Sequence, residues 1–181
     1  MRRAARGALV VHHDPELNGD PVRHLARPPL PSLAVALDAS TGGIVDVELK
    51  TDGDVPEGAA TALCSYLRRR NGRDRLLASS LDPVALRTVR TLRPDIPTAL
   101  VVEDESELGA TLREAVRAGH AAVHPQWKLV DRTLIKRARA LGLKVRVWTV
   151  NDGDEVHRLA KLGVDGLITD VPDVALAVLC D

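Results

Sequence analysis

The chain has 181 residues, of which 45% are hydrophobic and 28% are charged, a composition typical of one soluble globular domain. Its 25 basic and 25 acidic residues give a formal net charge of zero, which excludes the strong positive field that attracts nucleic acids or anionic membranes. Aromatic residues make up only 2%, so the core must be built from Val, Leu, Ile and Ala.

The cysteines and the apolar segments limit where the protein works. Cys64 and Cys180 match neither a disulfide framework nor a metal-binding spacing. Residues 7–11 are too short for the apolar part of a signal peptide, and no uncharged apolar run approaches the roughly 18 residues of a membrane span. We therefore expect a cytoplasmic protein with no membrane span and a single domain over residues 1–181.

The first forty residues predict few regular elements. Ala8–His13 is typical of a short strand, whereas the prolines and glycine of residues 14–31 indicate a loop. Ser32 is a good N-cap for a short helix over residues 33–37.

Strict alternation then predicts a strand at Ile44–Lys50. Val45, Val47 and Leu49 share one face, and Asp46, Glu48 and Lys50 share the other. Taken alone, this pattern favours an edge strand with a solvated charged face, because charges commonly protect edges. The alternative is a strand whose polar face lines a binding site.

Beyond residue 50 the chain alternates between strand and helix patterns. Strands are predicted at Ile44–Leu49, Arg75–Ser79, Thr98–Val102, Ala121–His124, Lys144–Thr149 and Gly166–Thr169. Helices are predicted at Val55–Arg70, Pro83–Leu92, Glu107–Ala118, Asp131–Leu141, Asp154–Leu162 and Pro172–Leu179. After the first interval the strands begin about 23 residues apart, which indicates stacked βα units and a fold of the α/β class.

A doubly wound sheet and a (β/α) TIM barrel both fit this alternation. The even spacing, without a glycine-rich dinucleotide turn, favours the barrel. About six units are present where a closed barrel has eight, so we expect an incomplete barrel.

Polar residues gather where the predicted strands end. Active sites of such barrels lie at the carboxyl ends of the strands, and the ends here carry Glu48, Lys50, Ser79, Ser80, Glu103, His124, Trp148, Asn151 and Asp170. If the charged face of residues 44–50 only protected a sheet edge, polar residues would not be expected at the ends of the other strands as well. The charged face of residues 44–50 is therefore interpreted as part of a binding pocket.

These motifs resemble those of the glycerophosphodiester phosphodiesterase family, whose members are (β/α)₈ barrels. Leu9–Asp14 is similar to the family's VVxHD strand and Val47–Lys50 to its E-(I/L)-K strand. Ser79–Asp82, His124-Pro125, Val145–Asn151 and Gly163–Pro172 follow in the family's order. The family's earlier His-Arg-Gly, Glu-Asn-Thr and Glu-x-Asp motifs have no counterpart, so the resemblance is to a member that lacks its first two strands at the N-terminal end.

The resemblance implies a role for six residues. His13, which directly precedes Asp14, corresponds to one acid/base; Glu48 to a ligand of Mg²⁺ or Ca²⁺; and Lys50 to a phosphate clamp. Trp148 corresponds to a wall of the substrate pocket, and His124 and Ser80 are further lining candidates. The first histidine and two of the three metal carboxylates are missing, so the divalent cation would be weakly held by a chain of this extent.

The implied function is metal-dependent hydrolysis of glycerophosphodiesters to glycerol 3-phosphate and an alcohol. The alternative is a catalytically inactive partial barrel that binds phosphorylated ligands or protein partners. An unrelated phosphate-binding barrel enzyme is a third hypothesis, which the ordered motifs disfavour. Because the absent strands would leave open barrel edges, we also expect homodimers or aggregation.

Overall fold

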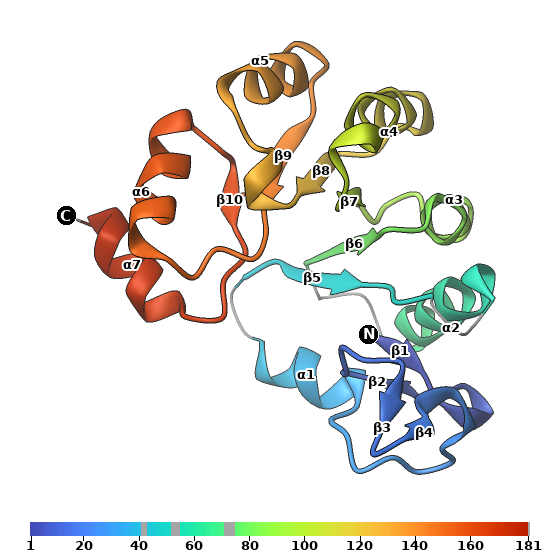
Figure 1. The fold of residues 1–181 in the computed structure, drawn as a ribbon. Coiled ribbons are helices and arrows are strands. Elements are labelled where there is room, and N and C mark those ends of the chain that lie inside the picture. The colour runs from blue at the N-terminus through green and yellow to red at the C-terminus, as the bar shows by residue number, and fades with distance from the viewer. Residues whose placement is uncertain (41–42, 52–54, 71–74, 181) are drawn as a thin grey trace. The chain divides into compact units, whose positions relative to one another are not determined.

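The computed structural model describes residues 1–40, 43–51, 55–70 and 75–180 (Figure 1). The chain divides into two compact units, Met1–Thr98 and Ala99–Asp181, each of which is described by itself. The expectation of a single domain over residues 1–181 stays a prediction.

The first unit opens with two small antiparallel pairs. β1 (Arg2–Arg3) pairs with β2 (Leu9–Val10), and β3 (Glu16–Leu17) pairs with β4 (Asp20–Pro21). Single-turn 3-10 helices follow β1 and β4, η1 at Ala5–Gly7 and η2 at Val22–His24. The strand predicted at Ala8–His13 is shorter than expected, because the N–H of Val11 donates to the carbonyl of Pro31 rather than to β1.

The rest of the first unit is two βα units. α1 (Leu33–Ala39) leads to β5 (Val45–Glu48), which pairs in parallel with β6 (Leu76–Ser80). Two helices, α2 (Pro56–Arg69) and α3 (Pro83–Leu92), accompany these strands. Val47 and Leu49 pack into one core cluster with residues of both helices. The alternation of β5 therefore turns Asp46, Glu48 and Lys50 away from the helices, as the sequence predicts.

The second unit repeats the βα pattern. β7 (Thr98–Val102), β8 (Ala122–Pro125), β9 (Lys144–Val147) and β10 (Gly166–Leu167) pair in parallel in that order. They alternate with α4 (Glu105–Ala118), α5 (Arg132–Ala140), α6 (Gly153–Leu162) and α7 (Pro172–Cys180), and η3 (Trp127–Leu129) follows β8. A single apolar cluster of strand and helix residues forms the core of this unit.

Side-chain caps and glycines set the helix boundaries. Asp104, Asp131 and Asp152 accept hydrogen bonds from the first turns of α4, α5 and α6. Gly119 and Gly163 end α4 and α6 with positive φ angles of 70° and 81°, which favour glycine.

The structure confirms the predicted α/β class with parallel strands. Within the described residues, β5 pairs in parallel with β6 in the first unit, and β7 to β10 pair in parallel in succession in the second. Each of these strands follows or precedes a helix at the predicted place. In the described part of the chain, no helix has both the length and the apolar character needed to cross a membrane.

Candidate functional site

A pocket of about 250 Å³ lies in the first unit. It is lined by residues at the carboxyl end of β5 and by residues 13–15, which lie between β2 and β3. Its lining residues are Arg2, His13, Asp14, Pro15, Glu48, Leu49, Lys50, Thr51 and Leu81. Three residues that the sequence predicts for the site, His13, Glu48 and Lys50, therefore line the same cavity.

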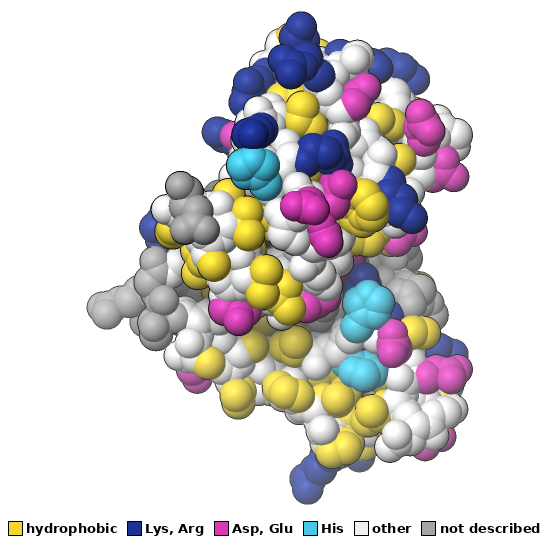
Figure 2. All heavy atoms as spheres, turned by 60° about the vertical axis from the view of Figure 1, so that its left-hand side comes forward, with side chains coloured by type: hydrophobic (Ala, Val, Ile, Leu, Met, Phe, Trp, Pro, Cys, Tyr) yellow, Lys and Arg dark blue, Asp and Glu magenta, His cyan; other side chains and the backbone are white. Residues whose placement is uncertain are grey.

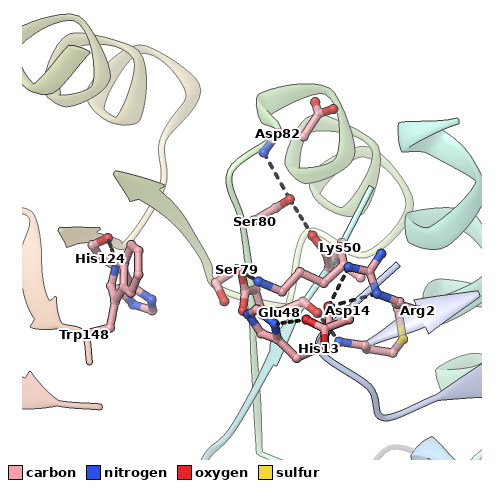
Figure 3. A network of polar contacts seen from close by, with 12 residues as sticks. Arg2, His13, Asp14, Glu48, Lys50, Ser79, Ser80, Asp82, His124 and Trp148 are labelled. Atoms are coloured by element: carbon pink, nitrogen blue, oxygen red, sulfur yellow. Dashed lines mark hydrogen bonds and ion pairs between the residues drawn. The ribbon is translucent and has the colours of Figure 1, made fainter. Parts of the chain in front are cut away.

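Glu48 and Lys50 form an ion pair at the pocket. Lys50 Nζ lies 2.8 Å from Glu48 Oε1, and the side chains are 16% and 35% exposed, respectively (Figure 3). The two residues reach one another because residues i and i+2 of a strand share a face. Partial burial strengthens the attraction relative to a fully solvated pair, so the ammonium is held beside the pocket rather than free in water.

The first residue extends the backbone pairing of β5. The Met1 ammonium donates to the carbonyl of Glu48 at 2.6 Å, and the carbonyl of Met1 accepts from the N–H of Lys50 at 3.1 Å. On the other side, Leu49 N–H donates to the carbonyl of Ser79. Burial lowers the pKa of the Met1 amino group to about 6, although the nearby Glu48 carboxylate opposes this shift. The strand end that carries Glu48 and Lys50 is thus held from both sides.

His13 and Asp14 form a second polar pair at the pocket. His13 Nδ1 lies 2.9 Å from Asp14 Oδ1, and this hydrogen bond is the main reason why the pKa of Asp14 is lowered below its usual range. A carboxylate can only accept, so Nδ1 carries the proton of the bond and the lone pair of a neutral ring lies on Nε2. The His13 side chain is 80% exposed and can exchange protons with solvent or a ligand.

His12 faces another way. Its Nε2 lies 3.0 Å from the carbonyl of Glu16, and the side chain does not line the pocket. The preference for His13 over His12 agrees with this geometry, whereas the acid/base role of His13 stays a prediction.

The two serines at the end of β6 form hydrogen bonds with residues of the neighbouring strand segment 46–49. Ser80 is fully buried; its hydroxyl donates to the carbonyl of Leu49 at 2.8 Å and accepts from the N–H of Asp82 at 3.1 Å. Ser79 donates to Asp46 Oδ1 at 2.8 Å. Ser80 therefore joins the end of β5 to the start of α3 rather than lining the pocket, and its predicted contact with substrate stays a prediction.

His124 and Trp148 lie together in the second unit. Trp148 Nε1 donates to the carbonyl of His124 at 2.7 Å (Figure 3). The His124 ring is 1% exposed, and its pKa is lowered to about 4, first by burial and then by the neighbouring Arg146 guanidinium. This ring is therefore neutral near pH 7. The substrate-lining roles of both residues stay predictions.

A divalent cation is not well matched by the donors that the structure describes. Among residues 1–40, 43–51, 55–70 and 75–180, no group of three or more His, Cys, Asp or Glu side chains could hold a metal ion. Ca²⁺ takes six to eight oxygen ligands, and Mg²⁺ takes six, usually from one or two carboxylates together with waters and substrate phosphates. The pocket is lined by two carboxylates, that of Glu48, which Lys50 already contacts, and that of Asp14, which is hydrogen-bonded to His13. The described residues thus do not fit the predicted Mg²⁺ or Ca²⁺ site, and the chemistry below is derived without it.

Two charged residues that line the pocket, Arg2 and Asp14, are missing from the site that the sequence predicts. Arg2 donates from Nε and Nη2 to the carbonyl of His13, at 2.9 Å and 2.5 Å. Arg2 and His13 are eleven positions apart, and no short sequence pattern indicates that two residues at this separation will be in contact. The sequence around Arg2 therefore does not mark it as a site residue. Asp14 does carry one, because an acid directly after a histidine can orient its ring.

Comparison with known proteins identifies the family of this sequence. The sequence model of the glycerophosphoryl diester phosphodiesterase family matches residues 33–174, a range that includes Glu48, Lys50 and Trp148 and begins after His13. A glycerophosphodiester phosphodiesterase of Caldanaerobacter subterraneus is 26% identical over 133 residues, which are 74% of this chain and 54% of that protein. The chain thus spans about half the length of this curated relative.

Solved structures show the same fold. A glycerophosphodiester phosphodiesterase from Parabacteroides distasonis superposes with a TM-score of 0.83 at 21% identity, covering 98% of this chain and 80% of that one. A glycerophosphoryl diester phosphodiesterase from Silicibacter pomeroyi has a TM-score of 0.74 at 27% identity, over 84% of this chain and 57% of that one. An Oleispira antarctica phosphodiesterase, solved with its product sn-glycerol-3-phosphate, has a TM-score of 0.76 at 24% identity, over 84% and 62%.

These likenesses confirm the predicted fold as part of a (β/α) barrel of the phosphodiesterase type. The family model covers most of the described strands and helices, from α1 to the start of α7. The chain belongs to the glycerophosphoryl diester phosphodiesterase family and covers part of that family's domain.

Proposed function

We propose that this chain carries part of the active site of an enzyme that hydrolyses glycerophosphodiesters to glycerol 3-phosphate and an alcohol. The family consists of phosphoric diester hydrolases, and the related Oleispira antarctica phosphodiesterase binds sn-glycerol-3-phosphate. The observation that carries the proposal is the meeting of His13, Glu48 and Lys50 at one pocket.

Lys50 is suited to hold the phosphate. A phosphodiester is an anion that repels nucleophiles, so a nearby ammonium both binds it and offsets the charge that develops in the transition state. Glu48 keeps the Lys50 ammonium at the pocket through their 2.8 Å contact. The pair thus supplies a positioned cation rather than a freely moving one.

His13 is suited to one of the proton transfers. In hydrolysis the oxygen of water bonds to phosphorus, the bond from phosphorus to the alcohol oxygen breaks, and a proton passes from the water to the alcohol. With Nδ1 hydrogen-bonded to Asp14, Nε2 of His13 is the ring nitrogen that can take up or return this proton. General acid–base catalysis of this kind contributes about 10²- to 10⁴-fold.

Binding without hydrolysis is the second candidate function. The carboxylates at the pocket favour it, because the described residues bring two there, Glu48 and Asp14, where the family resemblance implies a set of three metal ligands. A pocket with Lys50 and His13 alone could still bind a phosphomonoester or phosphodiester.

Turnover of glycerophosphocholine separates the two candidates. The full chain is incubated with this diester and Mg²⁺ or Ca²⁺, and released glycerol 3-phosphate is measured for the unchanged chain, His13→Ala and Lys50→Met. We expect release that falls about 100-fold or more in His13→Ala. His12→Ala is the matched control and should retain the activity.

Two other outcomes decide against hydrolysis. Saturable binding of glycerol 3-phosphate without any release would favour the binding function. Release that neither His13→Ala nor Lys50→Met reduces would contradict both candidates, since the activity would then come from elsewhere.

A further inference from the structure

Arg2 is a charged residue with almost no exposure. Its side chain lies on β1, is 6% exposed and lines the pocket together with His13 and Lys50. Arginine is seldom buried to this degree unless it has defined hydrogen-bond partners. The identity of those partners therefore indicates what the side chain does.

Two donors of the Arg2 guanidinium converge on one oxygen. Nε and Nη2 both donate to the main-chain carbonyl of His13, at 2.9 Å and 2.5 Å (Figure 3). The guanidinium is planar, so this fork fixes the direction of the His13 carbonyl as well as its distance. A lysine ammonium in the same place could offer charge but no planar fork.

The exposed imidazole of His13 has little else to fix its place. Its side chain is 80% exposed, and its ring contact is with Asp14, the next residue along the chain. A contact between neighbours orients the ring on the chain but does not attach the chain to the pocket. The Arg2 fork provides that attachment, since β1 adjoins the end of β5 through Met1.

We propose that Arg2 is a positioning residue that holds the His13–Asp14 segment at the phosphate pocket. The inference rests on the proposed function, because it assigns Arg2 a role toward the histidine of that site. Arg2 acts on His13 through the main chain and does not itself transfer a proton. A displacement of about 1 Å at a reacting group is enough to cost about 100-fold in rate, so such a support has a measurable consequence.

The coupling between bound phosphate and His13 tests this role. A phosphate bound near an imidazole favours its charged form and raises its pKa. The imidazole of His13 is titrated by NMR with and without glycerol 3-phosphate, in the unchanged chain and in Arg2→Lys. In the unchanged chain we expect the ligand to raise the midpoint of the His13 titration by about one pH unit. In Arg2→Lys this rise should disappear, whereas the signals of Lys50 should still shift on binding.

Arg3→Lys is the matched control. Arg3 neighbours Arg2 on β1, but its guanidinium lies against Gly58 of α2 and does not line the pocket. This variant should keep the ligand-dependent rise of the His13 midpoint. Where turnover is measurable, Arg2→Lys should lower kcat by about 100-fold with little change in KM.

Each outcome decides a separate question. If the ligand shifts neither His13 nor Lys50 in the unchanged chain, the proposed function fails. If it shifts both and Arg2→Lys keeps the rise at His13, the positioning role is overturned. A second measurement uses the unchanged chain, so it does not depend on how a variant folds. The Nε–H of Arg2 should exchange with solvent far more slowly than the Nε–H of exposed Arg23. Equally fast exchange at Arg2 and Arg23 would overturn the inference.

Discussion

At the scale of single residues, the site depends on groups whose charge the surroundings control. The Lys50 ammonium forms an ion pair with Glu48, and the Asp14 carboxylate is hydrogen-bonded to His13, which is the main reason why the pKa of Asp14 is lowered. His124 is the opposite case, because burial and Arg146 keep its ring neutral. The Lys50–Glu48 and His13–Asp14 pairs thus present charged groups at the pocket. The neutral His124, by contrast, should make the stability of the fold depend on pH in the acid range.

The neutral His124 predicts a loss of stability on acidification. Its pKa is about 4 in the folded chain and 6.5 in the unfolded chain, so the unfolded chain binds more protons between these values. The free energy of unfolding should therefore fall by roughly 3 kcal/mol as the pH falls from 7 toward 4. Urea unfolding at a series of pH values measures this fall.

Variants isolate the contribution of His124 from those of the carboxylates. In His124→Gln the free energy of unfolding should change less with pH between pH 6.5 and 4. Replacement of exposed His157 by Gln should leave this pH dependence unchanged. The same slope in all three proteins would contradict the assignment to His124.

At the scale of elements, the sequence predicts the βα units well and the N-terminal hairpins poorly. Hydrophobic periods and glycine caps are local signals, which is why α3 and β7 have the predicted bounds. α4 begins at Glu105 rather than Glu107 because Asp104 caps it. The hairpins of residues 2–21 depend on contacts between strands of two residues each, which leave no detectable period. Arg2 carries no sequence signal for the same reason, since its hydrogen bonds to the His13 carbonyl form only in the folded hairpin.

The turn between β1 and β2 predicts a stabilising change. Arg6 has a φ of 59° and ψ of 17°, a left-handed conformation that costs a residue with a Cβ about 1 kcal/mol or more. Asparagine tolerates this conformation better, so Arg6→Asn should raise the free energy of unfolding by about 0.5–1 kcal/mol. Chemical denaturation measures the gain.

A second arginine provides the comparison. Arg23→Asn, at an exposed position without a positive φ, should change stability by less than about 0.5 kcal/mol. If Arg6→Asn gained no more than Arg23→Asn, the strain at Arg6 would not be a cost to the fold.

At the scale of the whole molecule, exposed apolar side chains predict association. Hydrophobic side chains lie exposed among charges of both signs on the face shown in Figure 2. Leu176 and Leu179 of α7 are among the exposed large hydrophobic residues, at 61% and 51% exposure. Exposed apolar patches mark interaction or aggregation sites. We therefore expect dimers or larger species at micromolar concentration, measured by light scattering.

Charge on α7 should reverse this association. The double change Leu176→Lys and Leu179→Lys removes apolar surface without touching the core residue Ala175 of the same helix. It should shift the population toward monomers. A monomer with a sharp cooperative melt from the unchanged chain would contradict the expectation.

The central claim is that His13 and Lys50 face one phosphate-binding pocket, and binding of glycerol 3-phosphate tests it most directly. In an NMR titration of the unchanged chain, the His13 imidazole and the Lys50 side chain should shift together with one saturable dissociation constant. Lys50→Met should weaken binding about tenfold or more, because a contact between charged groups is lost. Exposed Lys161→Met should leave the binding unchanged. Shifts at neither residue, or equal affinity in Lys50→Met, would contradict the account.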